Sequence, residues 1–297
     1  MFSPKISQSA QQLTELSSQE LFAKIRFVNI PTSLSSSDIV SSYAVEGDSE
    51  TPIVLLHGFD SSLLEYRRLF PLLRQEYQVW AVDLLGFGFT ERKAEESFSP
   101  DTIKAHLYDF WSKMIAKPMI LVGASMGGAS AIDFCLSYPE AVDRLILLDS
   151  GGLTKKPMMS KFLFPPLGFL ATEFLRNLKV RQSISETAYC DRTYASEDAL
   201  RCAALHLDCD NWSKALISFT KSGGYGSFAP HLGNIQAPTL ILWGKQDKIL
   251  GTKPAEKFAE MIPQSKLIWI DNCGHVPHLE QSQITAEHIL GFLGSST

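Results

Sequence analysis

Short apolar runs alternate with segments of helical periodicity from about residue 50 onward, and this alternation constrains the fold more than any other feature. The apolar runs span residues 52–57, 79–83, 119–123, 145–149, 239–243 and 266–270. The helical patterns span residues 63–75, 101–116, 127–138, 253–261 and 285–293. Buried strands separated by helices are typical of a parallel sheet with helical crossover connections. The sequence therefore predicts an α/β fold with a mostly parallel sheet and helices on both faces.

Two segments depart from this alternation. Residues 25–30 and 38–44 have strand character and are joined by a serine-rich turn, which predicts an antiparallel pair at one edge of the sheet. Residues 151–236 contain several amphipathic helical patterns and no convincing strand. A structureless loop of this length is rare in a compact domain. We therefore interpret residues 151–236 as a helical cap, or lid, inserted into a core formed by residues 1–150 and 237–297.

Composition and charge exclude several classes of protein. The 297 residues are 45% hydrophobic and 20% charged, which is ordinary for a globular chain. The net charge is −5 and no stretch concentrates the basic residues, so nucleic acid is a poor partner. The N-terminal residues are polar, and no apolar run approaches the ~20 residues that a membrane span needs. We expect a cytoplasmic protein.

The five cysteines predict neither a disulfide framework nor a structural metal site. They are widely spaced, and none forms a CxxC or a cysteine–histidine pair at zinc-ligand spacing. Three of them lie between residues 190 and 209, so one local disulfide is an alternative to free thiols in a reducing compartment. The chain has no P-loop and no GxGxxG that opens a helix. We therefore expect no metal and no cofactor.

The motif GASMG at residues 123–127 lies between a predicted strand and a predicted helix. A GxSxG in that context is typical of a nucleophilic serine, because a sharp turn lifts the hydroxyl above the sheet and the glycines let strand and helix approach closely. The N-terminus of the helix also favours negative charge that develops during a reaction. Ser125 is therefore the candidate nucleophile.

Together with three further motifs, GASMG resembles the α/β-hydrolase superfamily from about residue 40 to the end. In chain order the motifs are HGF at 57–59, DLLGFG at 83–88, GASMG at 123–127, and WGKQD at 243–247 followed by NCGH at 272–275. The resemblance implies an α/β-hydrolase fold with an eight-stranded, mostly parallel sheet. It also implies a catalytic triad with Ser125 as nucleophile, His275 as general base and then acid, and Asp247 as the carboxylate that orients the histidine.

The chemistry of the residues agrees with this triad and leaves three alternatives. Serine needs an imidazole to accept its proton, and the imidazole needs a carboxylate that holds its tautomer. His278 is the rival base, which we interpret as a capping or packing residue. Asp149, at the end of the strand after the nucleophile helix, is the rival acid, since some members of the superfamily place the acid there. Asp83 is a third candidate acid, although the DxxGxG turn favours a structural role.

The remaining site residues concern the oxyanion hole and the substrate pocket. The backbone N–H groups of Phe59 and Met126 are expected to form the oxyanion hole. The side chains of Phe59 and Met126 are candidates for the pocket, with core packing as the alternative. By resemblance the apolar segment 157–172, with Phe162 and Phe164, roofs the cleft above Ser125. Such a roof favours a lipophilic, neutral substrate. Weak contact between the cap and a membrane surface is a further possibility that the sequence does not decide.

The motif set is most similar to carboxylesterases and monoacylglycerol-lipase-like members, and also to plastid and cyanobacterial hydrolases of lipophilic esters. We therefore expect a serine hydrolase of carboxylic esters. One alternative is a carbon–carbon bond hydrolase of vinylogous diketones. Those enzymes typically carry Asn before the nucleophile, where this chain has Ala124, and Trp shortly after the last histidine, where it has Val276 and His278. A non-catalytic binding protein of the same fold is the other alternative. No motif indicates the oligomeric state.

Overall fold

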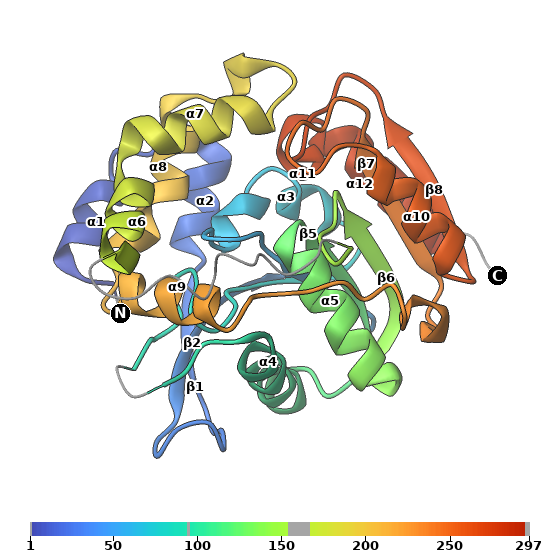
Figure 1. Ribbon diagram of the computed structural model, residues 1–297, viewed down its shortest axis with the longest axis horizontal. Coiled ribbons are helices and arrows are strands. Elements are labelled where there is room, and N and C mark those ends of the chain that lie inside the picture. Colours follow the sequence, from blue (N-terminus) through green and yellow to red (C-terminus); the bar gives the residue numbers. More distant parts are fainter. Residues whose placement is uncertain (1, 94–95, 154–166, 295–297) are drawn as a thin grey trace.

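Eight strands form one sheet at the centre of the computed structural model, which describes residues 2–93, 96–153 and 167–294 (Figure 1). The order in the sheet is β1-β2-β4-β3-β5-β6-β7-β8. β1 pairs with β2 and β2 pairs with β4 in the antiparallel sense, and all other neighbours are parallel. The strands are β1 (Arg26–Ile30), β2 (Ile39–Glu46), β3 (Pro52–Leu56), β4 (Gln78–Val82), β5 (Met119–Ala124), β6 (Val142–Leu148), β7 (Thr239–Gly244) and β8 (Ser265–Ile270).

Alternate residues of the central strands face two separate hydrophobic cores. In β3, Ile53 and Leu55 pack into one cluster, whereas Val54 and Leu56 pack into the other. Successive side chains of a strand point to opposite faces of the sheet, and all of β3 is buried. An uninterrupted apolar run such as this one therefore needs helices on both faces of the sheet.

Helices supply both layers. α4, α5 and α10 contribute to the core that contains Val54, and α3 and α12 contribute to the core that contains Ile53. Outside the insertion between β6 and β7, the helices are α1 (Pro4–Ala10), α2 (Leu16–Ala23), η1 (Leu63–Tyr66), α3 (Phe70–Leu73), α4 (Pro100–Met114), α5 (Met126–Ser137), η2 (Pro139–Ala141), α10 (Lys253–Met261), α11 (Pro277–Glu280) and α12 (Ser282–Gly294).

The insertion between β6 and β7 is helical where the structure describes it. Its helices are α6 (Leu167–Arg176), α7 (Leu178–Ala188), η4 (Arg192–Tyr194), α8 (Glu197–Ala204), η5 (Leu205–Asp208), α9 (Trp212–Lys221) and η6 (Leu232–Asn234). The N-terminal helices lie beside it (Figure 1). Asp198 of α8 accepts hydrogen bonds from the Glu15 N–H at 3.0 Å and the Ser18 hydroxyl at 2.5 Å. The division into core and cap stays a prediction, but these contacts join α8 to the N-terminal segment.

The predicted fold class is confirmed, including the antiparallel pair at the edge. One predicted element is wrong: residues 63–75 form two short helices, η1 and α3, instead of one. Pro71 is the physical reason, because a proline ring clashes with the carbonyl four residues earlier and lacks the N–H that a continuous helix needs.

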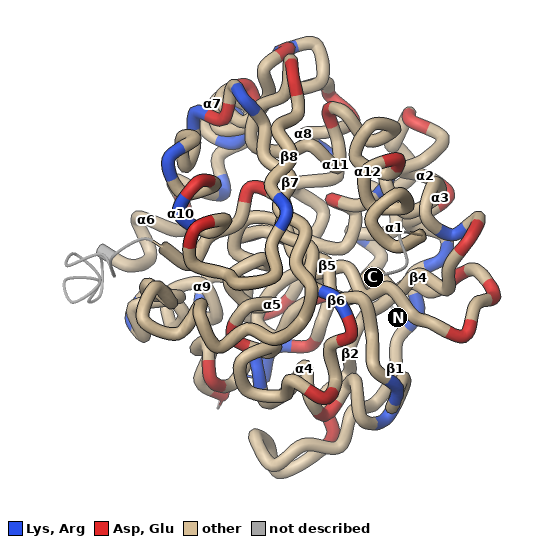
Figure 2. Tube along the Cα trace, turned by 90° about the vertical axis from the view of Figure 1, so that its right-hand side faces the viewer, with Lys and Arg blue, Asp and Glu red and all other residues tan. Residues whose placement is uncertain are grey.

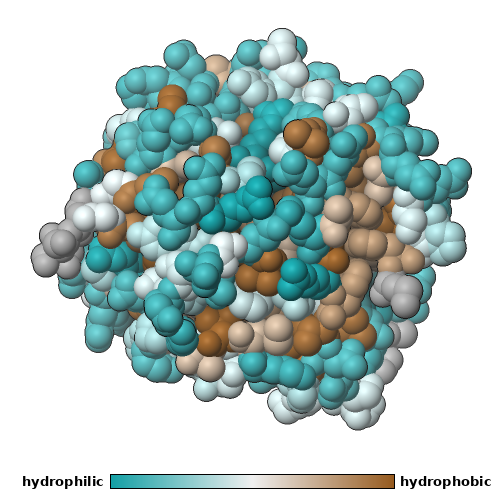
Figure 3. Space-filling model, turned by 180° about the vertical axis from the view of Figure 1, so that it is seen from behind, coloured by the Kyte–Doolittle hydropathy of each residue, from teal (hydrophilic) through white to brown (hydrophobic). Residues whose placement is uncertain are grey.

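The surface is mixed in charge and polarity. Basic and acidic residues are interspersed along the chain (Figure 2), and on the face in Figure 3 hydrophobic residues form patches between hydrophilic ones. All five cysteines are unpaired. Among the described helices, none combines the length and apolar character that a membrane crossing demands.

Candidate active site

Ser125 occupies a strained turn between β5 and α5. Its backbone angles are φ 52° and ψ −117°, which a non-glycine residue rarely adopts. The two glycines of the motif make the turn possible. A Cβ at Gly123 would lie 2.3 Å from the Gly127 carbonyl oxygen, and a Cβ at Gly127 would lie 2.0 Å from the Leu56 carbonyl oxygen. Any side chain at either position would therefore push the helix away from the sheet.

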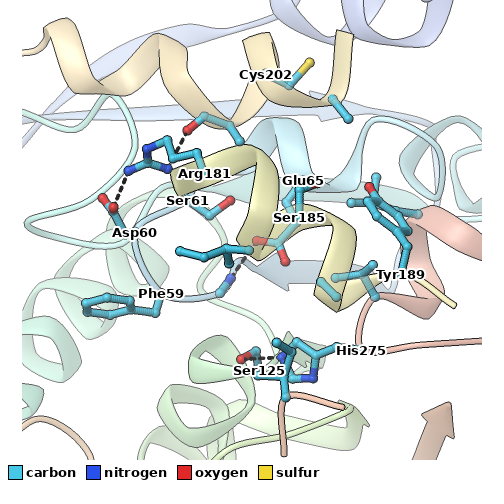
Figure 4. Close-up of a pocket in the computed structure, with 18 of the residues that line it drawn as sticks. Phe59, Asp60, Ser61, Glu65, Ser125, Arg181, Ser185, Tyr189, Cys202 and His275 are labelled. Atoms are coloured by element: carbon cyan, nitrogen blue, oxygen red, sulfur yellow. Dashed lines mark hydrogen bonds and ion pairs between the residues drawn. The ribbon is translucent and has the colours of Figure 1, made fainter. Parts of the chain in front are cut away.

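The structure brings Ser125, His275 and Asp247 into one hydrogen-bonded chain (Figure 4 labels Ser125 and His275). The Ser125 Oγ lies 2.9 Å from His275 Nε2, and His275 Nδ1 lies 3.0 Å from Asp247 Oδ2. A carboxylate only accepts, so Nδ1 carries the proton and Nε2 is free to accept the serine proton. The Asp247 Oδ1 accepts the N–H groups of Ile249 at 2.7 Å and Leu250 at 3.1 Å, which fixes the carboxylate in the loop after β7.

The two candidate acids have opposite pKa shifts. Burial acts to raise the pKa of Asp247, but the bonds from His275 and two backbone N–H groups bring it below its ordinary value. Burial and the neighbouring Asp247 carboxylate raise the pKa of Asp149 well above its ordinary value. The Asp149 carboxyl accepts a bifurcated bond from the Gly244 N–H, at 3.1 and 3.3 Å, and also hydrogen-bonds to the Asp247 carboxyl. These shifts favour the ionised form of Asp247, beside His275, and the protonated form of Asp149.

The loop after β3 is oriented by His57. The Leu84 N–H donates to His57 Nε2 at 3.2 Å, so the ring proton resides on Nδ1 and is donated to the Gly58 carbonyl oxygen at 2.8 Å. In a trans peptide the next N–H points the opposite way. The Phe59 N–H is thereby turned away from His57. Within the described residues, neither this N–H nor that of Met126, the first residue of α5, donates a hydrogen bond to the protein.

Glu65 and His278 hold the same loop, a role that the sequence analysis missed. The Gly58 N–H donates to Glu65 Oε2 at 2.8 Å, and His278 Nε2 lies 3.0 Å from Glu65 Oε1. Burial acts to raise the pKa of Glu65, but His278 and the Gly58 N–H lower it to about 2. His278 is thus a structural partner of Glu65. No local sequence signal pairs these residues, which are 213 positions apart.

Asp60 links the loop to the insertion and was also missed. Its carboxylate accepts the Trp212 indole N–H at 2.8 Å, lies 3.1 Å from His206 Nε2, and forms an ion pair with Arg181 of α7 (Figure 4). These partners lower the pKa of Asp60 against the effect of burial. The rival acid Asp83 is structural as well: it accepts the N–H groups of Leu63 and Phe89.

Two cavities meet at Ser125. The α7-side cavity has a volume of about 310 Å³ (Figure 4). It is lined by Ser125, His275, residues of α7 and α8 such as Ser185, and Tyr189, which follows α7. The α9-side cavity has a volume of about 360 Å³ and is lined by Ser125, Met126 and residues of α9 and the segment after it. Phe59 lines both cavities and Met126 lines the α9-side cavity; their role in binding substrate stays a prediction. The predicted pocket residues Phe162 and Phe164 lie outside the described residues.

Among the described residues, one cluster of acidic and histidine side chains is compact enough to hold a metal ion. Ligand atoms of Asp149, Asp247 and His275 lie within 4.8 Å of one another. Both ring nitrogens of His275 already face Asp247 and Ser125. The hydrogen bonds of Asp247 to His275 and to Asp149 therefore account for this grouping.

The chain and its structure match known proteins. A family model described as the alpha/beta hydrolase fold matches residues 51–282. The alpha/beta hydrolase domain-containing protein VTE7 of Arabidopsis thaliana is 32% identical over 250 residues, which cover 84% of this chain and 76% of that protein. The 2-hydroxy-6-oxo-6-(2'-aminophenyl)hexa-2,4-dienoic acid hydrolase of Metapseudomonas resinovorans is 28% identical over 298 residues, covering 96% of this chain and 95% of that protein.

A solved structure agrees with the fold. A thermophilic esterase from Thermogutta terrifontis superposes with a TM-score of 0.76 at 22% identity, covering 90% of this chain and 98% of that chain. At this identity the likeness concerns the fold alone. The family model, by contrast, spans the segment that contains Ser125, Asp247 and His275. The chain therefore belongs to the alpha/beta hydrolase family and is a hydrolase of that fold.

Proposed function

We propose that the protein is a serine hydrolase that cleaves carboxylic esters of lipophilic substrates through an acyl-enzyme on Ser125. The observation that best supports this proposal is the chain of hydrogen bonds from the Ser125 Oγ through His275 to Asp247, with distances of 2.9 and 3.0 Å. An imidazole whose far nitrogen is held by a carboxylate accepts the serine proton and stabilises the resulting cation. A serine at a strained turn with this partner is typical of a nucleophile.

The reaction follows from the geometry in two steps. The Ser125 Oγ attacks the ester carbonyl carbon as His275 Nε2 takes its proton, and the carbonyl electrons move onto the oxygen. The N–H groups of Phe59 and Met126 donate to that oxyanion. The C–O bond to the alcohol then breaks, and His275 returns the proton to the departing alcohol oxygen. Water, deprotonated by His275, repeats the sequence and releases the acid and Ser125.

Lipophilic substrates are supported by the cavity walls and by the outer surface of the insertion. Phe59 is 45% exposed at the junction of the cavities, and Ile184 of α7 is 49% exposed and lines the α7-side cavity. On α6, Phe169, Leu170 and Phe174 are 50%, 62% and 63% exposed. Exposed apolar groups of this kind are typical of a surface that meets lipid or another apolar partner. The proposal includes weak contact between α6 and a membrane surface.

Carbon–carbon bond hydrolysis is the second candidate. It is favoured by the relative named as a dienoic acid hydrolase, which aligns over nearly the whole chain. Against it stand Ala124, before the nucleophile, and Val276, after the last triad residue, where enzymes of that class typically carry Asn and Trp. The two candidates share the triad, so the substrate decides between them.

The test compares labelling and turnover. A fluorophosphonate probe is expected to label the wild-type protein on Ser125, and Ser125→Ala is expected to lose both labelling and at least ~10⁴-fold in kcat on p-nitrophenyl esters. Turnover of a vinylogous diketone with poor turnover of esters would favour the second candidate. A Ser125→Ala protein that keeps a tenth of the ester activity would refute the serine mechanism.

A further inference from the structure

Ser125 lies where two cavities of different character meet. Charged side chains line part of the α7-side cavity: Glu65, Arg67 and Arg181 belong to its wall. The α9-side cavity has no charged residue in its wall among the described residues. Its aromatic residues form a connected row, in which the ring centroids of Phe59 and Phe219 are 6.0 Å apart and those of Phe219 and Tyr225 are also 6.0 Å apart. An ester bound at Ser125 would extend one substituent into each cavity.

The position of His275 decides which substituent enters which cavity. In acyl transfer the general acid must reach the oxygen of the departing alcohol. The acyl substituent extends from the carbonyl carbon in a different direction, away from that oxygen. His275 and its neighbour Val276 line the α7-side cavity. Neither residue lines the α9-side cavity, whose wall beside Ser125 is formed by Met126, Ala129 and Gly151. The alcohol oxygen therefore lies on the α7 side of Ser125.

We infer that the α9-side cavity binds the acyl chain and that the α7-side cavity binds the alcohol. This assignment rests on the proposed function and deepens it. Four positions in the wall of the acyl cavity have no side chain because they are glycines: Gly151, Gly152, Gly223 and Gly224. With Phe219 and Tyr225 they form a site for a neutral, apolar acyl group. The alcohol cavity, with Glu65, Arg67 and Arg181 in its wall, would take an alcohol that carries a polar group.

A matched pair of substitutions tests the assignment. Thr220 on α9 lines the acyl cavity and Ser185 on α7 lines the alcohol cavity (Figure 4 shows Ser185). Both side chains are partly exposed and hydroxylated, and among the described residues neither hydrogen-bonds to Ser125, Asp247 or His275. Thr220→Phe and Ser185→Phe therefore introduce the same ring into one cavity each. Phe292→Ala on α12, which lines neither cavity, is the control.

Two substrate series give the readout. In the acyl series the alcohol is p-nitrophenol and the acid runs from acetyl to octanoyl; in the alcohol series the acid is acetic and the alcohol lengthens. Each methylene that leaves water contributes roughly a fourfold gain in kcat/KM. Thr220→Phe is expected to lower the octanoyl-to-acetyl ratio of kcat/KM at least ~10-fold and to leave the alcohol-series ratio within ~2-fold. Ser185→Phe is expected to do the reverse.

Deacylation gives a second readout that a general loss of activity would not reproduce. Once the alcohol has left, the acyl-enzyme contains only the acyl chain, so its hydrolysis depends on the acyl cavity alone. Thr220→Phe is expected to change the rate of octanoyl-enzyme hydrolysis, and Ser185→Phe is not. An acyl chain with a terminal carboxylate is expected to react at least ~10-fold more slowly than octanoyl.

The outcomes separate the assignment from the function on which it rests. If the two variants exchange their effects, or if the carboxylate-bearing acyl chain reacts as fast as octanoyl, the assignment is wrong while ester hydrolysis stands. If the wild-type protein neither reacts with the fluorophosphonate probe nor cleaves any member of either series, the proposed function itself fails.

Discussion

At the residue scale, Asp149 and Asp247 show how position decides the ionisation of two neighbouring carboxyls. Asp247 accepts bonds from His275, Ile249 and Leu250, whereas the fully buried Asp149 accepts a bond from the Gly244 N–H and shares one with Asp247. Two carboxylates this close cannot both ionise without strong repulsion. Besides Asp247, the Glu280 carboxylate also acts to raise the pKa of Asp149. One carboxyl therefore serves His275 and the other stays neutral.

This difference predicts unequal effects of two matched substitutions. Asp247→Asn is expected to lower kcat at least ~10³-fold, because an amide cannot stabilise the imidazolium that forms on His275. Asp149→Asn is expected to cost less than ~10-fold, because an amide has nearly the shape of the neutral carboxyl that it replaces. Steady-state kinetics on one p-nitrophenyl ester measure both effects. The reverse order would make Asp149 the acid.

Glu65 predicts how stability depends on pH. The folded-state pKa of Glu65 is lowered from 4.5 to about 2, so the folded protein binds fewer protons than the unfolded chain between these values. The stabilisation from Glu65 is therefore complete above about pH 4.5 and is lost as the pH falls towards 2. Glu65→Gln removes this dependence.

Urea unfolding at pH 6 and pH 3.5 checks the prediction. The destabilisation caused by Glu65→Gln, of up to ~3 kcal/mol at pH 6, is expected to shrink at pH 3.5. Glu140→Gln, at an exposed position, serves as the control. A difference in the free energy of unfolding that is equal at both pH values would contradict the role given to the Glu65 carboxylate.

At the scale of elements, α7 and the loop after β3 are coupled through Asp60. The Arg181 side chain comes from α7, and Asp60 follows directly after Phe59, whose N–H is a proposed oxyanion donor. α7 also reaches the triad from its C-terminal end, where the Ala188 carbonyl accepts the His275 N–H at 2.7 Å. A Cβ at Gly274 would lie 2.2 Å from that carbonyl oxygen. Displacement of α7 would therefore disturb two parts of the site.

Arg181→Gln is expected to lower kcat on a small ester such as phenyl acetate about 10-fold, because the loop that presents the Phe59 N–H loses an ionic anchor. Lys179→Ala, which removes an exposed cation from the same helix, is the matched control. Stopped-time assays of kcat and a melting curve measure both variants. A change in melting temperature without a change in kcat would show that the ion pair only stabilises the fold.

At the scale of the whole molecule, exposed apolar side chains concentrate on the insertion. Five of the nine large exposed hydrophobic residues in the described chain lie between residues 169 and 184: Phe169, Leu170, Phe174, Leu178 and Ile184. Lys179 is an exposed cation in the same segment, whereas Arg176 pairs with Glu173 at 3.3 Å. An exposed apolar surface with an adjoining cation is the basis for expecting contact with an anionic lipid surface.

We expect the wild-type protein to co-sediment with vesicles of phosphatidylcholine that contain phosphatidylglycerol. The double variant Phe169→Ser, Phe174→Ser is expected to bind several-fold less, because each fully buried apolar side chain contributes roughly 1.5–3 kcal/mol. Leu16→Ser, which removes a side chain that is 69% exposed on α2, is the control. If all three proteins bind the vesicles equally, α6 does not contribute to lipid binding.

By itself, the sequence determined the α/β class, the antiparallel edge pair and the positions of Ser125 and His275. These features depend on local patterns: apolar runs specify buried strands, and GASMG specifies a turn that only glycine at residues 123 and 127 permits. Tertiary structure alone decided which carboxyl is ionised, because Asp149 and Asp247 differ only in the groups that fold around them.

The contacts of Asp60 with Arg181 and of Glu65 with His278 also required the tertiary structure, since they join residues 121 and 213 positions apart. Buried charges must find partners, yet nothing in the local sequence says which charge becomes buried beside which. The two cavities at Ser125 arise in the same way, because their walls combine the loop after β3, the insertion and the core. Packing between distant segments therefore shapes the site around a nucleophile that the sequence alone can locate.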